Sequence, residues 1–407
     1  MMSLKVKNIL LVNTYYYPEI QGGAEYSVKK LAEALTQKGH KVLVLSSAKE
    51  NMHEVIEGVN VQRVKFHSIY HSYGTMKKCP LTKLVHRILD FKNPFNKKLI
   101  EDVLKAFKPD VVHTNNLYEI TPEIWKVAYE YNIPVIHTIR DYYLMCPKAT
   151  LMKKNNEGCG KESILCRSYQ DINRKLTRYV RVLTAPSSRM ISYVIKKDFF
   201  KNSIKQVVYN AFEFDLNQIE ESINLHNSSL NQEKVTFVYL GSFFKHKGIE
   251  FLINAFCQLN NDNARLILAG KGPEQEIVEQ ACKANQNILY AGFLEQKEID
   301  LLLQKCDILI CPSLWNEPFG RVVLDAYKNG LPVIACNVGA MPEIIDNEKT
   351  GILVQPNNIQ ELIGAMNRFM EDKSLLIEFR SNLINKLTEF SIDKQVECFE
   401  DLYNKLG

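Results

Sequence analysis

Two carboxylates lie close together in residues 314–335, LWNEPFGRVVLDAYKNGLPVIA, an apolar segment punctuated by proline and glycine. Glu317 precedes a Pro-Phe-Gly turn, and seven residues separate it from Asp325. The preceding run, DILICPS, has the pattern of a buried strand, and we expect a helix that starts near Phe319. Because a carboxylate accepts two hydrogen bonds from a vicinal diol, the two acids are candidates for binding sugar hydroxyls. The alternative is that Glu317 is an N-terminal helix acid and Asp325 a solvated face residue.

Alternating strand and helix patterns surround this segment. Short apolar runs such as KNILLVN and KVLVLSS alternate with amphipathic stretches such as SVKKLAEALTQKGH (27–40), and the pattern restarts near residue 205. This alternation predicts an α/β fold with parallel, doubly wound sheets, in which ligands bind at the carboxyl ends of the strands. We expect two Rossmann-like domains facing across a cleft, residues 1–212 and 213–390, with a C-terminal helix at about 391–407 that packs back on the first. The polar stretch 221–234, ESINLHNSSLNQEK, reads as a linker.

The two halves of the chain carry opposite charge. Residues 1–212 contain 34 Lys and Arg against 18 Asp and Glu, a net of +16, whereas residues 213–407 contain 17 against 28, a net of −11. The basic half is therefore expected to meet something anionic, such as nucleic acid, an acidic membrane surface or a phosphorylated acceptor.

Length and composition restrict the class of protein. A chain of 407 residues exceeds what one hydrophobic core usually supports. No apolar run reaches the roughly 18 residues needed to span a bilayer, and no signal peptide is recognisable. The ten cysteines are scattered, mostly in apolar runs, which suits a reducing compartment. We expect a cytoplasmic protein that is associated with a membrane at most peripherally.

The segment from Glu317 onwards resembles the C-terminal domain of family 4 glycosyltransferases, also called group 1. Their motif is E-x7-E, followed by an A-x-x-x-G-x-P-V-I-A run and a P-E-hydrophobic turn, and it is matched here by Glu317, Gly330, Pro332 and Glu343. Asp325 replaces the second Glu and is one methylene shorter. The resemblance covers nearly the whole chain, through YYYPEIQGG, PDVVHTN, TAPSS, YLGSFFKHKG and LAGKGPE. It implies the GT-B fold and a sugar-nucleotide donor bound by the C-terminal domain.

The resemblance also implies residues that bind the diphosphate of the donor. Gly22 and Gly23 would let the first loop approach the diphosphate, because glycine has no Cβ and exposes its N–H group. Lys247 matches the basic residue that pairs with the diphosphate as it leaves. Ser242 stands where the family often has Arg, so the second cation is missing or is supplied by Lys245 or Arg321.

The nucleotide is expected to lie against turns and a helix start. In the family the position of Asp325 binds the ribose hydroxyls. The expected nucleotide-binding residues are Ser242, Gly270, Gly272, Phe293, Leu294, Phe319, Gly320, Arg321 and Asp325. The turn glycines among them have an equally good, purely structural interpretation.

On the acceptor side, the segment VIHTIRDYY ends a strand inside the basic half. Family members often carry His at the second polar position of an HTxH-like segment, where the imidazole contacts the sugar and is thought to assist catalysis. Here His137 fills the first position and Arg140 the second, followed by Asp141. The catalytic role of the usual histidine is therefore lost or passes to one of these three residues. The alternative for His137 is a structural hydrogen bond at the strand end.

Three cysteines in the first half, Cys146, Cys159 and Cys166, have the spacing C-x12-C-x6-C. A structural zinc site needs four ligands and usually a close pair of cysteines, so reduced thiols are favoured and no metal site is expected. A metal or redox cluster with a fourth partner and a disulfide remain as alternatives.

A basic amphipathic stretch covers MKKCPLTKLVHRILDFKNPFNKK, residues 76–98. Its cations are interleaved with apolar residues, which is typical of a segment that docks on anionic lipid. A solvated basic face is the other interpretation. The cations are Lys77, Lys78, Lys83, Arg87, Lys92, Lys97 and Lys98.

The leading hypothesis is a retaining glycosyltransferase that moves a sugar from a UDP- or GDP-sugar to a glycan, a lipid-linked acceptor or another polar acceptor in cell-surface polysaccharide or glycoconjugate synthesis. No Asp-x-Asp pair occurs in the sequence, so we expect a metal-independent enzyme that needs no cofactor beyond its donor. The alternative enzyme is a sugar-nucleotide epimerase or phosphorylase on the same two-domain plan. A dinucleotide oxidoreductase is disfavoured because the first loop reads PEIQGG and not G-x-G-x-x-G. A non-enzymatic anionic-surface or nucleic-acid-binding protein is disfavoured because aromatic residues are not interleaved with the cations, and no nucleic-acid partner is expected.

Overall fold

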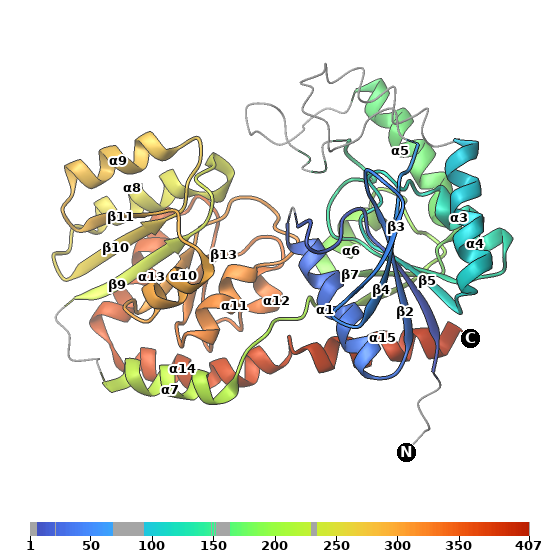
Figure 1. The fold of residues 1–407 in the computed structure, drawn as a ribbon. Helices are drawn as coiled ribbons and strands as arrows, with labels where there is room; N and C mark the ends of the chain where they lie inside the picture. Colours follow the sequence, from blue (N-terminus) through green and yellow to red (C-terminus); the bar gives the residue numbers. More distant parts are fainter. Residues whose placement is uncertain are drawn as a thin grey trace. The chain divides into compact units, whose positions relative to one another are not determined.

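The computed structural model describes residues 6–20, 22–67, 93–147, 149, 151, 163–228 and 234–406. The chain divides into two compact units, each built on its own sheet (Figure 1). Unit 1 contains the described residues up to Ala211 together with those from Ile392 onwards, and unit 2 is Phe212–Ser391. The chain therefore passes from unit 1 to unit 2 and returns for its last helix.

Unit 1 has a sheet of order β3-β4-β2-β1-β5-β6-β7-β8. Neighbouring strands are parallel, except that β3 and β4 form an antiparallel hairpin through Glu57 and Gly58, both in the left-handed region. In the centre, Leu10 is in register with Leu43 on one side and Val112 on the other. The strands are β1 (Asn8–Val12), β2 (Lys41–Ser47), β3 (Met52–Ile56), β4 (Val59–Val64), β5 (Val111–Thr114), β6 (Val135–Thr138), β7 (Val182–Ala185) and β8 (Ile204–Val207).

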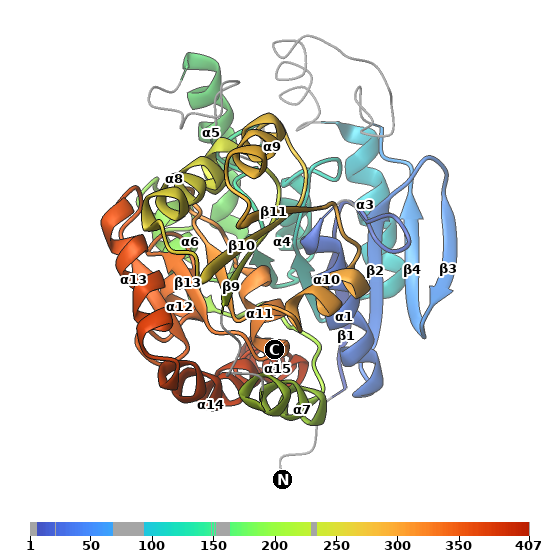
Figure 2. The same ribbon diagram turned by 90° about the vertical axis from the view of Figure 1, so that its left-hand side faces the viewer.

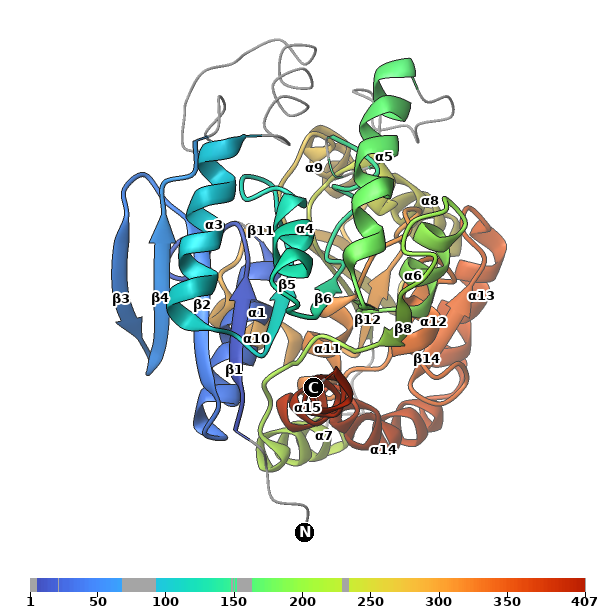
Figure 3. The same cartoon turned by 90° about the vertical axis from the view of Figure 1, so that its right-hand side faces the viewer.

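Helices cover both faces of this sheet. On one face, α1 and α15 pack together through residues such as Val28 and Phe399 against the strand residues Ile9 and Val44. On the other face, α3 and α4 lie side by side (Figure 3). The described helices of unit 1 are α1 (Gly23–Gln37), α3 (Pro94–Phe107), α4 (Glu123–Glu130), α5 (Ile164–Leu176), the 3₁₀ turn η1 (Thr177–Tyr179), α6 (Ser188–Ile195) and α15 (Ile392–Leu406).

Unit 2 has a fully parallel sheet of order β11-β10-β9-β12-β13-β14. Its buried strands pack against helices that include α8, α9 and α13, with α8 beside α13 (Figure 2). The strands are β9 (Val235–Leu240), β10 (Ala264–Ala269), β11 (Ile288–Gly292), β12 (Ile308–Cys311), β13 (Val333–Cys336) and β14 (Gly351–Val354). The helices are α7 (Leu216–Ser228), the 3₁₀ turn η2 (Lys245–Lys247), α8 (Ile249–Leu259), α9 (Gln275–Ala284), α10 (Gln296–Leu303), α11 (Arg321–Lys328), α12 (Met341–Ile344), α13 (Ile359–Glu371) and α14 (Ser374–Thr388).

The prediction of two Rossmann-like α/β units is confirmed, but the predicted linker at 221–234 is wrong over its first part. Residues 221–228 belong to α7, whose Ile219, Ile223 and His226 are buried. These three side chains follow helical spacing and share one face, which explains why a polar stretch forms a packed helix. Within the described parts of the chain, no helix is long and apolar enough to cross a membrane.

Candidate functional site

The structure brings Lys247 and Glu317 together in unit 2, although they are 70 residues apart in the sequence. Lys247 is the last residue of η2, and its Nζ lies 2.6 Å from Oε1 of Glu317 in the loop after β12. The two side chains are only 24% and 12% exposed, so the ion pair is partly shielded from water. The Trp315 ring flanks the pair, with its centroid 5.5 Å from Lys247 Nζ. The sequence predicted both residues, and the structure adds their direct contact.

Gly248 explains how this pair is held. Gly248 has a φ of +75°, and a Cβ at this position would lie 2.0 Å from the carbonyl oxygen of Pro312. The backbone of Leu314 donates a hydrogen bond of 2.9 Å to the carbonyl of His246. The η2 turn therefore lies directly against the loop after β12, and only glycine allows this approach.

The other side of Glu317 is enclosed by a turn that the sequence analysis missed. Gly339 has a φ of +54°, and a Cβ there would lie 2.4 Å from the Glu317 nitrogen. Ala340 donates its N–H to the Glu317 carbonyl at 3.0 Å. The only signal in the sequence was a glycine in NVGAMPE, directly after β13.

Helix α11 begins at Arg321, two residues later than the predicted start near Phe319. Phe319 instead packs edge-on against Phe390, with ring centroids 5.9 Å apart. Gly320 is the N-cap residue, and a Cβ there would lie 2.6 Å from Met341 Cε. The exposed Arg321 extends over the ring of Phe212, 5.8 Å from its centroid.

Asp325 lies in α11, and its Oδ1 accepts a hydrogen bond of 3.3 Å from Gln296 Nε2 of α10. Burial raises the pKa of Asp325 to about 6; Arg321 opposes this shift and Asp300 adds to it. Its carboxylate is therefore charged at neutral pH but poorly solvated. Such a group has spare capacity to accept hydrogen bonds from a ligand.

The raised pKa of Asp325 predicts a stability penalty. Between pH 3.8 and about 6 the folded chain holds a proton that the unfolded chain has lost, so the free energy of unfolding falls as pH rises through this window. We expect Asp325→Asn to raise the free energy of unfolding at pH 7 by about 1 to 3 kcal/mol and to flatten its pH dependence. Urea denaturation at several pH values measures this, with the exposed Asp262→Asn as control. The prediction would be contradicted if the free energy of unfolding changed with pH in the same way for the wild type and for Asp325→Asn.

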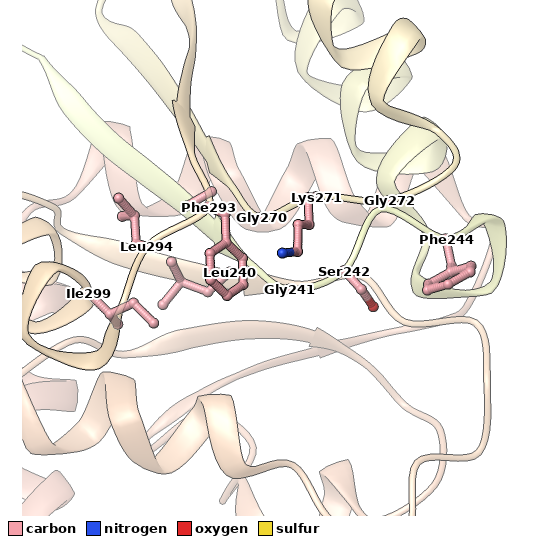
Figure 4. A pocket seen from close by; sticks show the side chains of 11 residues that line it. Leu240, Gly241, Ser242, Phe244, Gly270, Lys271, Gly272, Phe293, Leu294 and Ile299 are labelled. Carbon is pink, nitrogen blue, oxygen red and sulfur yellow. The ribbon is translucent and has the colours of Figure 1, made fainter. Parts of the chain in front are cut away.

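A cavity of about 480 Å³ opens at the carboxyl ends of β9, β10 and β11 (Figure 4). Its glycines permit close turns, because a Cβ on Gly270 would lie 1.8 Å from the Gly241 carbonyl and one on Gly272 would lie 2.6 Å from that of Phe243. Five residues predicted for nucleotide binding meet here. The lining residues are Leu240, Gly241, Ser242, Phe244, Ala269, Gly270, Lys271, Gly272, Phe293, Leu294 and Ile299.

The charged residue of this cavity, Lys271, was missed by the sequence analysis. Its Nζ lies 4.0 Å from the centroid of the Phe293 ring (Figure 4). The signal available was a lysine between two glycines in LAGKGPE. The cavity also adjoins the Lys247 turn, since the lining residue Phe244 stacks on His246 with ring centroids 5.4 Å apart.

In unit 1, Gly22 and Gly23 form the start of α1, four residues before the predicted helix 27–40. The helix starts early because Glu25 Oε2 accepts the Gly22 N–H at 2.8 Å, which caps the first turn. A Cβ on Gly23 would meet no atom within 4 Å. The space beside Gly23 is therefore open.

His137 lies in the core of unit 1. Its Nδ1 is 2.9 Å from Thr114 Oγ1, its ring packs against Trp125 and Phe200, and it is only 3% exposed. Burial lowers its pKa to about 3, so the imidazole is neutral. This placement favours the structural alternative for His137 over a catalytic role.

Arg140 and Asp141 follow β6 and lie near the ends of β5 and β8. Arg140 donates from Nε to Asn115 Oδ1 at 3.1 Å and from Nη1 to Asn210 Oδ1. Asp141 accepts from Asn116 Nδ2 at 3.2 Å and from the Tyr143 backbone at 2.7 Å. Both described hydrogen bonds of Arg140 go to neutral amide oxygens.

The remaining predicted features are only partly covered by the described residues. Cys159 and the basic residues Lys77, Lys78, Lys83, Arg87 and Lys92 lie outside them. Cys146 and Cys166 are free thiols, and no cluster of three or more His, Cys, Asp or Glu residues suited to a metal occurs in the described segments. Lys97 of the basic stretch pairs with Glu130 at 2.9 Å.

Comparison with protein families gives matches along both units. Residues 21–216 match the family model described as Glycosyltransferase Family 4, and residues 221–389 match the one described as Glycosyl transferases group 1. A 42.6 kDa protein of the cps region of Klebsiella pneumoniae is 33% identical over 341 residues, covering 83% of this chain and 87% of that protein. The glycosyltransferase MJ1607 of Methanocaldococcus jannaschii is 28% identical over 395 residues, covering 93% and 91%.

Solved structures share the fold at low sequence identity. Anabaena HepE in complex with UDP has a TM-score of 0.69 and 18% identity, covering 98% of this chain and 99% of its own. Sucrose-phosphate synthase from Thermosynechococcus elongatus has a TM-score of 0.69 and 18% identity, covering 98% of each chain. With two parallel-sheet α/β units and family matches along both, this chain belongs to the group 1, or family 4, glycosyltransferases of the GT-B fold.

Proposed function

We propose that this glycosyltransferase is a retaining, metal-independent enzyme that uses a UDP- or GDP-sugar. Unit 2 holds the donor, and unit 1 holds a glycan, a lipid-linked acceptor or another polar acceptor. The observation that carries the proposal is the Lys247–Glu317 ion pair. The close backbone approach at Gly248 holds this pair, which adjoins the cavity of about 480 Å³.

The donor site follows from the chemistry of these residues. The cavity has apolar walls, glycine turns and one cation, Lys271, which suit the flat base and polar groups of a nucleotide. Asp325 at the second turn of α11 accepts the ribose hydroxyls, and Glu317 accepts those of the transferred sugar. Phe319, Gly320 and Arg321 shape the approach to this helix.

Lys247 stabilises the leaving group. The bond between the anomeric carbon and the diphosphate breaks, and both electrons stay on the diphosphate. The acceptor oxygen bonds to the anomeric carbon on the same face, and its proton passes to the departing diphosphate. The ammonium group of Lys247 compensates the developing negative charge. We assign Arg140 to the binding of the acceptor.

Relatives support the class of donor and acceptor. HepE of the same fold is known in complex with UDP and with UDP-glucose. The O-antigen chain mannosyltransferase C of Escherichia coli is 21% identical over 98% of this chain, which favours a role in cell-surface polysaccharide synthesis. The net charge of +16 on residues 1–212 favours a cytoplasmic protein with peripheral contact to anionic membrane.

Thermal denaturation with a panel of nucleotides tests the proposal. UDP or GDP at 100-fold its Kd should stabilise the chain by about 2.7 kcal/mol, whereas NAD and oligonucleotides should leave the melting temperature unchanged. Lys247→Ala should lose most of the stabilisation. Stabilisation by NAD alone, or release of an epimerised sugar nucleotide as the product, would contradict the proposed function.

A further inference from the structure

Arg140 is a partly buried cation whose two described hydrogen bonds go to neutral amides, Asn115 Oδ1 and Asn210 Oδ1. Its third nitrogen, Nη2, is buried and has no hydrogen-bond partner. The amide nitrogen Nδ2 of Asn115 is also buried without a partner. Because Asn115 Oδ1 contacts Arg140 Nε, these unsatisfied groups lie in one cluster, and both are hydrogen-bond donors.

No carboxylate compensates this charge among the described residues, since none forms an ion pair with Arg140. Burial lowers the pKa of Arg140, and Glu25 only partly offsets this effect through space. The Glu25 carboxylate is itself bound to the Gly22 N–H at 2.8 Å. The neighbouring His137 is neutral, because burial lowers its pKa to about 3.

The cluster lies where a parallel sheet binds its ligands. Asn115 directly follows β5, Arg140 lies two residues after β6, and Asn210 follows β8. These are carboxyl ends of parallel strands within unit 1.

We infer that Arg140 and Asn115 bind an anionic group of the acceptor, either a carboxylate on a sugar or a phosphate. A neutral hydroxyl would leave the guanidinium charge uncompensated, and its own proton would find no acceptor among the two unsatisfied donors. A carboxylate or phosphate only accepts hydrogen bonds and matches the planar donor geometry of arginine. The inference rests on the proposed function, in which unit 1 holds the acceptor.

Isothermal titration of the full chain with UDP at saturation tests the inference, because UDP keeps phosphate probes out of the donor site. The probes are methyl glucuronide, methyl glucoside, which lacks the carboxylate, and inorganic phosphate. We expect the wild type to bind at least one charged probe and not the glucoside. Arg140→Gln should weaken that binding about 10- to 100-fold, as expected for a lost charged hydrogen bond. The exposed Arg178→Gln is the matched control and should bind like the wild type.

The preferred probe identifies the source of the anion, since glucuronide indicates an acidic sugar and phosphate a phosphorylated acceptor. Equal binding of charged probes by the wild type and Arg140→Gln would overturn the inference, as would a wild type that binds neither. If UDP itself fails to bind, the proposed donor site is wrong; UDP binding without probe binding refutes the anion site alone.

Asn115→Asp separates ligand binding from a merely structural role. A carboxylate at this position would supply Arg140 with the missing counter-charge, so we expect a higher melting temperature and loss of binding of the charged probe. If Arg140 only supports the fold, Arg140→Gln should lower the melting temperature, and Asn115→Asp should leave probe binding unchanged. That pair of results would also overturn the inference.

Discussion

Lys247→Ala is expected to lower kcat/KM for the sugar-nucleotide donor by about 100- to 1,000-fold, the usual effect of losing one group that stabilises a developing anion. The ammonium group is the cation held 2.6 Å from Glu317, and alanine removes it from the leaving diphosphate. Steady-state kinetics of donor hydrolysis and transfer measure the loss. It should appear in kcat as well as in KM, because the charge on the diphosphate grows during the reaction.

The matched control is Lys283→Ala, which removes an exposed lysine of α9 outside the cavity. Its kcat/KM should stay close to that of the wild type. Urea denaturation of Lys247→Ala guards against indirect effects, since that substitution leaves the half-buried Glu317 carboxylate without its partner. A well-folded Lys247→Ala variant with activity within twofold of the wild type would rule out the assigned role.

Gly248→Ala is expected to lower the free energy of unfolding by about 2 to 4 kcal/mol, through the left-handed backbone and the collision of the new Cβ. The methyl group would lie 2.0 Å from the Pro312 carbonyl oxygen, so η2 or the loop after β12 must move. Any such movement separates Lys247 from Glu317. The free energy of unfolding and the rate of donor hydrolysis, measured on the same sample, should therefore both fall.

Gly364→Ala provides the matched control. Gly364 lies inside α13, and a Cβ there would meet no atom within 4 Å. Alanine should raise the free energy of unfolding by roughly 0.5 to 1 kcal/mol, because it restricts the unfolded chain and favours the helix. If Gly248→Ala and Gly364→Ala changed the free energy of unfolding similarly, the close approach of Pro312 to residue 248 would not exclude a side chain there.

The grouping of residues around the cavity of unit 2 was largely predictable because they lie at strand ends and turns. Ser242, Gly270 and Phe293 follow three neighbouring parallel strands, so one cavity at the sheet edge collects them. The Lys247–Glu317 contact was not predictable, since it depends on the tertiary approach of two loops. Gly248 and Gly339 make that approach possible, and a single sequence does not reveal which glycine meets which backbone.

The end of β6 shows where sequence reasoning failed to predict which polar side chain is buried. His137 and Arg140 are both polar residues near the end of β6, and their types alone do not tell which one is enclosed in the core. The strand boundary decides it, because His137 lies within β6, where every side chain is buried, whereas Arg140 lies two residues beyond the strand and is only partly buried. Helix α7 was mistaken for a linker because its polar residues outnumber the three that are buried.

The last helix has a consequence for how the protein is made. The α15 residues Val396 and Phe399 complete the core beneath α1, and Tyr403 Oη lies 2.7 Å from Nδ1 of the buried His113. Unit 1 thus begins with β1 but gains the 15-residue helix α15 only after all of unit 2 has been translated. A nascent chain should close the later-encoded unit first, and a stop codon at 392 would leave apolar surface open for chaperones and proteases.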